Sequence, residues 1–237
     1  MSPRTLEKAP QSVGFGIVWV FFMVLAAWGQ SSPVDQESLH IQQPASSSGL
    51  QVVVLLDISP HQKKVIPVEL ALAEGIIQKL DQPENTFSVI TFGSQTPTLL
   101  KLGVTAVEAI AAIRGVAVEE TKDKYFSIRF YDALSLAIGQ FTDDSPSKSL
   151  VIISEGNDYF PHKAFKSTVA RARQLQVACN VAMVADHSLY GTKGIQRYGF
   201  DLRRLAAKTH GQYLEVGEKQ KKVPRSVERL SESILNQ

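Results

Sequence analysis

The sequence lacks most of the features that would assign it to a specialised class of protein. It holds a single cysteine, Cys179, so an internal disulfide and a cysteine-cluster zinc site are excluded. The formal net charge is only +2, and the one short basic run, at 219–222, is explained by a solvated loop, so nothing indicates a nucleic-acid partner. With 44% hydrophobic and 20% charged residues among 237, the composition is that of an ordinary globular protein.

One long hydrophobic run is present, near the N-terminus. Residues 13–27 are uncharged and follow a weakly positive start, and the small residues Ala27 and Gly29 precede Gln30. This pattern is typical of a secretory signal peptide. We expect residues 1–29 to be a signal peptide cleaved after Gly29, or else an uncleaved anchor that gives the protein a membrane contact. The rest of the chain is then extracytoplasmic, either periplasmic or secreted.

Two further regions follow this segment. Residues 30–49 are rich in Ser, Gln and Pro, which predicts a flexible linker. Residues 50–237 alternate apolar strand-like runs with helix-like segments, which predicts one α/β domain with a parallel sheet covered on both faces. Strands are expected over 50–57, 86–92, 98–102, 148–154, 177–184 and 211–216, and helices over 65–80, 104–113, 130–141, 163–175, 201–209 and 223–235. Cys179 falls in a central strand, so we expect a buried free thiol.

Acidic segments follow two of the predicted strands and open one predicted helix. They are Asp57-Ile-Ser59, Tyr131-Asp132 and Ser154-Glu-Gly-Asn-Asp158. Because the carboxyl ends of parallel strands meet at one edge of a sheet, and ligands bind there, we expect these segments to lie close together.

The order of these segments resembles the von Willebrand factor A (VWFA) domain, and most narrowly the exported bacterial VWFA-related proteins. The resemblance covers about residues 50–217. It rests on Val-Leu-Leu-Asp-Ile-Ser59, Ser-Val-Ile-Thr-Phe92, Tyr131-Asp-Ala-Leu134, Leu150-Val-Ile-Ile-Ser-Glu-Gly-Asn-Asp158 and Leu202-Arg-Arg-Leu-Ala-Ala-Lys-Thr-His-Gly-Gln-Tyr213. It implies a Rossmann-like, doubly wound, mostly parallel sheet with helices on both faces.

The resemblance also implies a metal-ion-dependent adhesion site. In that family an Asp-x-Ser-x-Ser motif, a loop threonine and an Asp-Gly aspartate hold a divalent cation. Asp57 and Ser59 match the first two positions here, whereas His61 stands where the second serine is expected. Mg²⁺ prefers oxygen ligands, so an imidazole is a poor substitute.

The remaining two positions of the family's motif also differ. Ile128 stands at the threonine, with Ser127 one residue away, and Glu155 replaces the aspartate. The candidate metal ligands are therefore Asp57, Ser59 and Glu155, in a degenerate site. We expect no cofactor, or at most weakly bound Mg²⁺.

Simpler interpretations and other chemistries stay open at this stage. Asp57, followed by Ser59-Pro60, can cap the first helix or shape the turn before it, and Asp132 can complement a helix dipole. His61 near Ser59 and Asp57 superficially resembles a hydrolase triad, and His61 with Glu155 offers two ligands for zinc.

The surface expected to bind a partner is the carboxyl edge of the sheet. It is formed by the loops at 57–64, 93–97, 116–129, 155–162 and 186–200, of which the last is long for its fold and rich in aromatic and arginine side chains. The candidate contact residues are His61, Ser127, Asp158, Tyr190, Arg197 and Tyr198. We expect an exported, non-catalytic module that binds an unidentified protein. The alternatives are a divalent-cation-dependent adhesion module and, third, an extracytoplasmic hydrolase.

Overall fold

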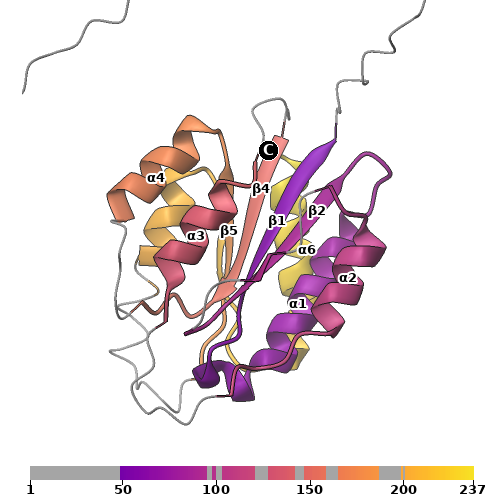
Figure 1. Cartoon of the computed structure of the whole chain (residues 1–237). Coiled ribbons are helices and arrows are strands. Elements are labelled where there is room, and N and C mark those ends of the chain that lie inside the picture. Colours follow the sequence, from indigo (N-terminus) through magenta and orange to yellow (C-terminus); the bar gives the residue numbers. More distant parts are fainter. Residues whose placement is uncertain are drawn as a thin grey trace, which may run out of the picture. The chain divides into compact units, whose positions relative to one another are not determined.

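The computed structural model describes residues 49–94, 98–99, 103–120, 128–141, 147–158, 165–186, 199 and 201–237. A six-stranded sheet in the order β3-β2-β1-β4-β5-β6 forms the centre of this part of the chain (Figure 1). The strands are β1 (Leu50–Asp57), β2 (Thr86–Phe92), β3 (Thr98–Leu99), β4 (Ser147–Ser154), β5 (Ala178–Met183) and β6 (Tyr213–Glu215). Every neighbouring pair is parallel except β2 and β3. The mostly parallel sheet expected from the sequence is confirmed.

Strand β1 lies at the centre of the sheet, which explains its unbroken apolar sequence. Val52 and Val54 pack against one face of the sheet, and Val53 and Leu55 against the other, and all four side chains are fully buried. A strand covered on both faces needs apolar residues at every position rather than at alternate ones.

The register between strands brings their carboxyl ends to one edge. Asp57 at the end of β1 lies opposite Phe92 at the end of β2, and Leu56 lies opposite Ile153 in β4. The residues that follow β1, β2 and β4 therefore emerge side by side, as the candidate site requires.

Helices cover both faces of the sheet (Figure 1). They are α1 (Ile66–Lys79), α2 (Ala106–Arg114), α3 (Phe130–Ile138), α4 (Phe165–Gln174), α6 (Val223–Leu235) and the helical residues 201–208, with short 3-10 turns η1 (Pro60–Lys64) and η2 (Gln220–Lys222). Helices α1, α2 and α6 bury their apolar faces against one side, while α3, α4 and 201–208 pack against the other. The doubly wound arrangement is thus confirmed. In the described part of the chain, no helix combines the length and apolar character needed to cross a membrane.

The main departure from the expected elements lies just after β1. Instead of a loop leading to a helix at 65–80, residues Pro60–Lys64 form the turn η1, and α1 begins at Ile66. Pro60 occupies the first turn of η1, where its fixed φ angle suits a helical start. The turn is closed by the backbone N–H of Gln62, which donates to the Ser59 carbonyl at 2.8 Å. It places Gln62, fully buried, beneath the end of β1.

Cys179 lies in β5, as predicted, and is fully buried. Burial raises the pKa of its thiol to about 12, so the thiol form persists at neutral pH. The expectation of a buried free thiol is confirmed.

The neighbouring Asn180 is a buried polar residue whose side-chain nitrogen and oxygen both form hydrogen bonds. Its Nδ2 donates to Ser149 Oγ at 3.0 Å. Its Oδ1 accepts from the Gln212 backbone N–H at 2.9 Å, from Ser233 Oγ at 3.2 Å and from Gln237 Nε2 at 3.4 Å. These contacts, the Asn180 cluster below, tie β4 and β5 to the start of β6 and the end of α6.

Candidate functional site

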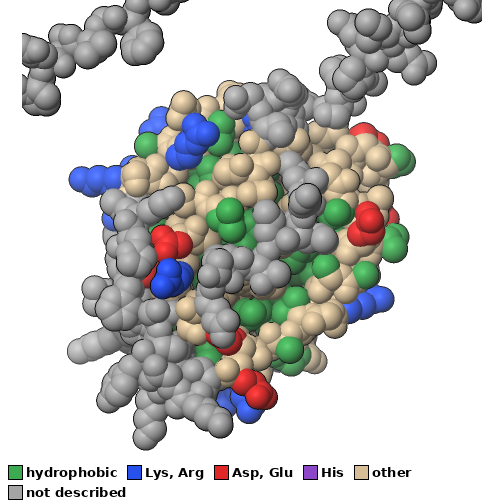
Figure 2. Space-filling model, in the orientation of Figure 1, with side chains coloured by type: hydrophobic (Ala, Val, Ile, Leu, Met, Phe, Trp, Pro, Cys, Tyr) green, Lys and Arg blue, Asp and Glu red, His purple; other side chains and the backbone are tan. Residues whose placement is uncertain are grey.

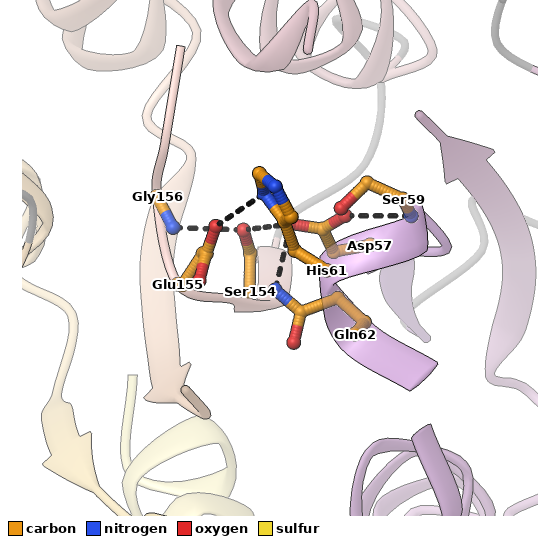
Figure 3. Close-up of polar contacts among 7 residues, drawn as sticks. All are labelled: Asp57, Ser59, His61, Gln62, Ser154, Glu155 and Gly156. Carbon is orange, nitrogen blue, oxygen red and sulfur yellow. Dashed lines mark hydrogen bonds and ion pairs between the residues drawn. The ribbon is translucent and has the colours of Figure 1, made fainter. Parts of the chain in front are cut away.

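Polar side chains that are almost completely buried gather at the carboxyl edge of the sheet (Figure 3). Asp57, Ser59 and Ser154 are fully buried, and Glu155 is 2% exposed. The predicted site residues Asp57, Ser59, His61 and Glu155 are therefore brought together, as the parallel sheet led us to expect.

Asp57 accepts hydrogen bonds from three different parts of the chain. The backbone N–H of Ser59 donates to Asp57 Oδ1 at 3.0 Å, and the Ser154 hydroxyl donates to Oδ2 at 2.8 Å. The Gln62 side-chain amide donates to Oδ2 at 3.4 Å. Burial raises the pKa of Asp57 from 3.8 to about 6, although these hydrogen bonds favour the charged form and limit the rise.

Gly156 continues this hydrogen-bonded chain across the sheet edge. Its backbone N–H donates to Ser154 Oγ at 2.9 Å, and the same hydroxyl donates to Asp57. Gly156 has φ of +78°, a conformation that side chains disfavour. A Cβ atom here would also lie 2.7 Å from the Leu202 side chain. The glycine is therefore required both by its backbone and by its neighbour.

Glu155 and His61 face each other above Asp57 (Figure 3). His61 Nδ1 lies 3.8 Å from Glu155 Oε1, and the His61 side chain is 26% exposed. Burial lowers the pKa of His61, which favours the neutral imidazole at neutral pH. The two residues form an ion pair only when the imidazole is protonated.

The Ser59 hydroxyl lies beside Asp57 but makes no hydrogen bond of acceptable geometry to any residue that the structure describes. Its proximity to Asp57 nonetheless favours the charged form of that carboxyl group. Ile128, at the expected threonine position, is fully buried in the apolar cluster that contains Phe92 and Phe130, so its side chain supplies no ligand. Ser127 lies outside the described residues.

Few candidate ligands for a cation lie together among the described side chains. No group of three or more His, Cys, Asp or Glu side chains among them is placed to hold an ion. Mg²⁺ prefers oxygen ligands and keeps several waters when one or two carboxylates bind it. Asp57, Ser59 and Glu155 offer such oxygens here, and three protein donors already occupy oxygens of Asp57.

Glu69 is a buried acid near the site that the sequence analysis did not select. It lies on α1, is fully buried, and neither carboxylate oxygen has a hydrogen-bond partner among the described residues. Burial raises its pKa well above the usual 4.5, and the nearby charges of Asp57 and Glu155 raise it further. The sequence does contain a pattern that indicates burial of Glu69. It stands on the apolar stripe of its helix, four residues after Val65 and three before Leu72.

Asp186 is a second acid at this edge, just beyond β5. Its side chain is 2% exposed, and its Oδ2 lies 3.0 Å from Lys64 Nζ. This pair ties η1 to the end of β5. In the sequence, Asp186 stands at the start of the long loop 186–200.

The structure describes some of the candidate contact residues and leaves others outside its described part. His61 lies at the edge, half-buried. Asp158 accepts a hydrogen bond at 2.9 Å from the backbone N–H of Tyr131, in the first turn of α3, so it holds that helix in place. Ser127, Tyr190, Arg197 and Tyr198 lie outside the described residues, and their roles stay predictions.

Two alternative interpretations can be compared with these contacts. The bond from the Ser59 N–H to Asp57 is a turn of the kind expected if Asp57 shapes the backbone after β1. A serine hydrolase needs a hydrogen bond between the serine hydroxyl and the histidine. Within the described residues, Ser59 Oγ donates no hydrogen bond to His61.

A pocket of about 770 Å³ opens beside η1. It is lined by Pro60, Lys63, Ile66 and residues 117–120. Glu119 anchors this lining segment, because its carboxylate accepts from the backbone N–H of Ser94 at 2.7 Å and its own N–H donates to the Ile58 carbonyl at 2.8 Å. The pocket is therefore built directly onto the ends of β1 and β2.

Comparison with known proteins gives structural matches only. No family model matches the chain, and no curated protein matches its sequence. An aerotolerance-related membrane protein from Bacteroides fragilis is similar in structure, with 15% identity and a TM-score of 0.58, over 80% of this chain and 100% of that one.

The names of two other similar structures state a VWA domain or a metal-ion-dependent adhesion site. The VWA domain of SpRpn10 shares 15% identity with a TM-score of 0.53, over 76% of this chain and 94% of that one. Proximal thread matrix protein 1 from the mussel byssus, with a zinc-occupied metal-ion-dependent adhesion site, shares 14% identity with a TM-score of 0.59, over 78% of this chain and 46% of that one. The chain therefore contains a domain of the von Willebrand factor A fold.

Proposed function

We propose that this chain is an exported, non-catalytic binding module that contacts a partner protein through the carboxyl edge of its sheet. The observation that carries the proposal is the pocket beside η1, lined by Lys63 and residues 117–120, next to the buried polar site at Asp57. Ligands of open α/β sheets bind at this edge. The scaffold under the pocket is rigid, since Glu119 is tied to two strand ends.

The charges on the face shown in Figure 2 favour a protein over a nucleic acid as its partner. In the view of Figure 2, acidic and basic side chains are scattered and intermixed on the drawn residues, with apolar atoms between them. A nucleic-acid-binding face instead presents a continuous basic stripe. The pocket itself combines Lys63 with Glu119 and Glu120, which suits a partner of mixed charge.

Location outside the cytoplasm is part of the proposal. The hydrophobic run at 13–27, with its small residues before Gln30, predicts export, and one similar structure is that of a membrane protein. Residues 1–48 lie outside the described part of the chain. N-terminal sequencing of the mature protein should read Gln30 first. Recovery of intact Met1 in a soluble cytosolic fraction would contradict export.

Photo-crosslinking tests where the partner binds. A crosslinking amino acid at Lys63, in the pocket, should give a discrete covalent adduct in the producing cells. The matched control is the same amino acid at Glu84, an exposed residue at the amino ends of the strands. Adducts from Glu84 as strong as those from Lys63 would contradict binding at the carboxyl edge.

A second candidate is a cation-dependent adhesion module. Two observations support it: the buried, unbonded Ser59 hydroxyl, and the zinc-occupied adhesion site of the byssus protein. This candidate requires adduct formation from Lys63 to fall in EDTA and to recover when Mg²⁺ or Zn²⁺ is restored. Equal yields in both conditions favour the first proposal.

A further inference from the structure

A second concave surface lies between β6 and the start of α6, with a lining different from that of the η1 pocket. This groove has a volume of about 440 Å³. Its lining includes four cationic side chains, Lys221, Lys222, Arg225 and Arg229, and one acid, Glu215. The chain as a whole has a net charge of only +2, so this concentration of positive charge is local.

The four cations are exposed and have no partner within the described part of the chain. None of them forms an ion pair or a side-chain hydrogen bond with a described residue. Some other cations of the domain are paired, as in Lys64–Asp186, Lys79–Glu228 and Arg114–Glu74. The groove therefore holds an excess of positive charge, which Glu215 in its lining offsets only in part.

Two further features of the groove suit an anion. Helix α6 has no acidic residue in its first turn and no side-chain cap, so its positive dipole end is not neutralised there. Ser226 lines the groove, is only 9% exposed, and makes no side-chain hydrogen bond to a described residue. Its hydroxyl can donate to a ligand in the groove.

The spacing of the cations matches an extended chain rather than a single small anion. Arg225 and Arg229 are four residues apart on α6, which separates them by about 6 Å along the helix, and Lys221 precedes Arg225 by the same number of residues. Alternate residues of a β-strand lie about 6.6 Å apart. Carboxylates at alternate positions of an extended segment can therefore meet successive cations.

The neighbouring strand offers backbone groups to such a segment. β6 is the last strand of the described sheet and pairs only with β5 there, and its Leu214 and Glu215 line the groove. An edge strand presents unpaired N–H and C=O groups that an extended peptide can join. Arginine adds planar, bidentate recognition of carboxylates.

We propose that this groove binds an extended acidic segment of a partner protein, with Asp or Glu at alternate positions. It is a different surface from the η1 pocket, so the two proposals stand or fall separately. Among the described residues, the groove lining includes no aromatic side chain for stacking bases, which disfavours single-stranded nucleic acid.

The test is fluorescence anisotropy with the purified protein and a labelled synthetic peptide that alternates Glu with Ser. We expect saturable binding that weakens with salt, and weaker binding of a peptide of the same composition with its Glu residues contiguous. The double variant Arg225→Glu/Arg229→Glu should weaken binding at least about tenfold, or about 1.4 kcal/mol. Circular dichroism checks that the variants are folded.

The matched control is Lys166→Glu/Arg173→Glu, which makes the same change of charge on exposed positions of α4. It should bind like the unaltered protein. Equal loss in both double variants, or no preference for the alternating peptide, overturns the proposal. Tighter Arg225-dependent binding to vesicles containing phosphatidylserine, or to polyphosphate, also overturns it in favour of a lipid or phosphate ligand.

Discussion

The Asn180 cluster and the carboxyl-edge site are both buried and polar, but they differ in how their polar groups are satisfied. Around Asn180, the side-chain oxygen and nitrogen both have partners. At the carboxyl edge, Ser59 Oγ, Gln62 Oε1 and both oxygens of Glu69 have none within the described residues. Unsatisfied buried groups are costly, and native proteins keep few of them. The comparison separates a cluster whose central side chain is hydrogen-bonded at both of its polar atoms from one in which several buried polar atoms have no partner among the described residues.

The largest expected effect comes from breaking the satisfied cluster. Asn180→Leu keeps a similar volume but leaves the Gln212 backbone N–H and the Ser149 hydroxyl without their partner. We expect the free energy of unfolding to fall by about 3 kcal/mol, measured by denaturant titration. Asn236→Leu, at an exposed position, is the control and should change little. A loss no greater than that of the control would show that the Asn180 cluster is not stabilising.

A smaller loss is expected at the edge of the sheet, from Gly156→Ala. This variant combines a disfavoured positive φ with an overlap against Leu202, and we expect a loss of about 2 kcal/mol. Gly103→Ala separates the cost of the backbone conformation from the cost of the contact with Leu202. Gly103 has φ of +101°, but nothing lies within 4 Å of an added Cβ. Equal losses in the two variants would mean that the contact with Leu202 contributes nothing.

Glu69→Gln should stabilise the protein, in contrast to the two previous variants. Its raised folded-state pKa means that the folded protein holds a proton that the unfolded chain releases above about pH 4.5. The contribution of Glu69 to stability is therefore greatest at low pH and falls as pH rises toward the folded-state value. We expect Glu69→Gln to gain about 1 kcal/mol at pH 8 and much less at pH 4.

Denaturant titrations at both pH values measure this difference. Asp57 has a folded-state pKa of about 6, so it also makes the free energy of unfolding fall as pH rises. This contribution is the same in the unaltered protein and in Glu69→Gln. Glu84→Gln, on an exposed glutamate, is the control and should leave the pH dependence unchanged. A destabilised Glu69→Gln at pH 8 would mean that the Glu69 carboxylate has a partner of its own.

The sequence predicted the strands and helices well because their apolar patterns are strong. Strands β1 and β2 and helix α6 begin and end where expected. Of the expected strand 98–102, the structure describes Thr98–Leu99 as β3, and residues 100–102 lie outside the described part. The expected helix 130–141 ends at Ile138, where Gly139 forms the C-cap. Element ends depend on local caps and on pairing with neighbouring strands, which periodicity does not reveal.

The site could be predicted only as far as strand order determines it. Asp57, Ser59 and Glu155 follow parallel strands, so their convergence is a consequence of the fold. Glu69 was missed because a glutamate within an apolar helix stripe shows its neighbours only once the helix is packed. Likewise, the basic run at 219–222 reads as a solvated loop until α6 places Arg225 and Arg229 beside it.

The central claim is that hydrogen bonds within the protein, rather than a bound cation, hold the carboxyl edge together. Thermal unfolding in EDTA and in millimolar Mg²⁺, Mn²⁺ or Zn²⁺ tests it most directly, because an ion at about 100 times its Kd stabilises a fold by about 2.7 kcal/mol. We predict the same Tm in all conditions, for the unaltered protein and for Asp57→Ala alike, whatever their absolute stabilities. A clear rise in Tm with a cation, abolished by Asp57→Ala, would contradict the claim and establish the edge as a working metal site.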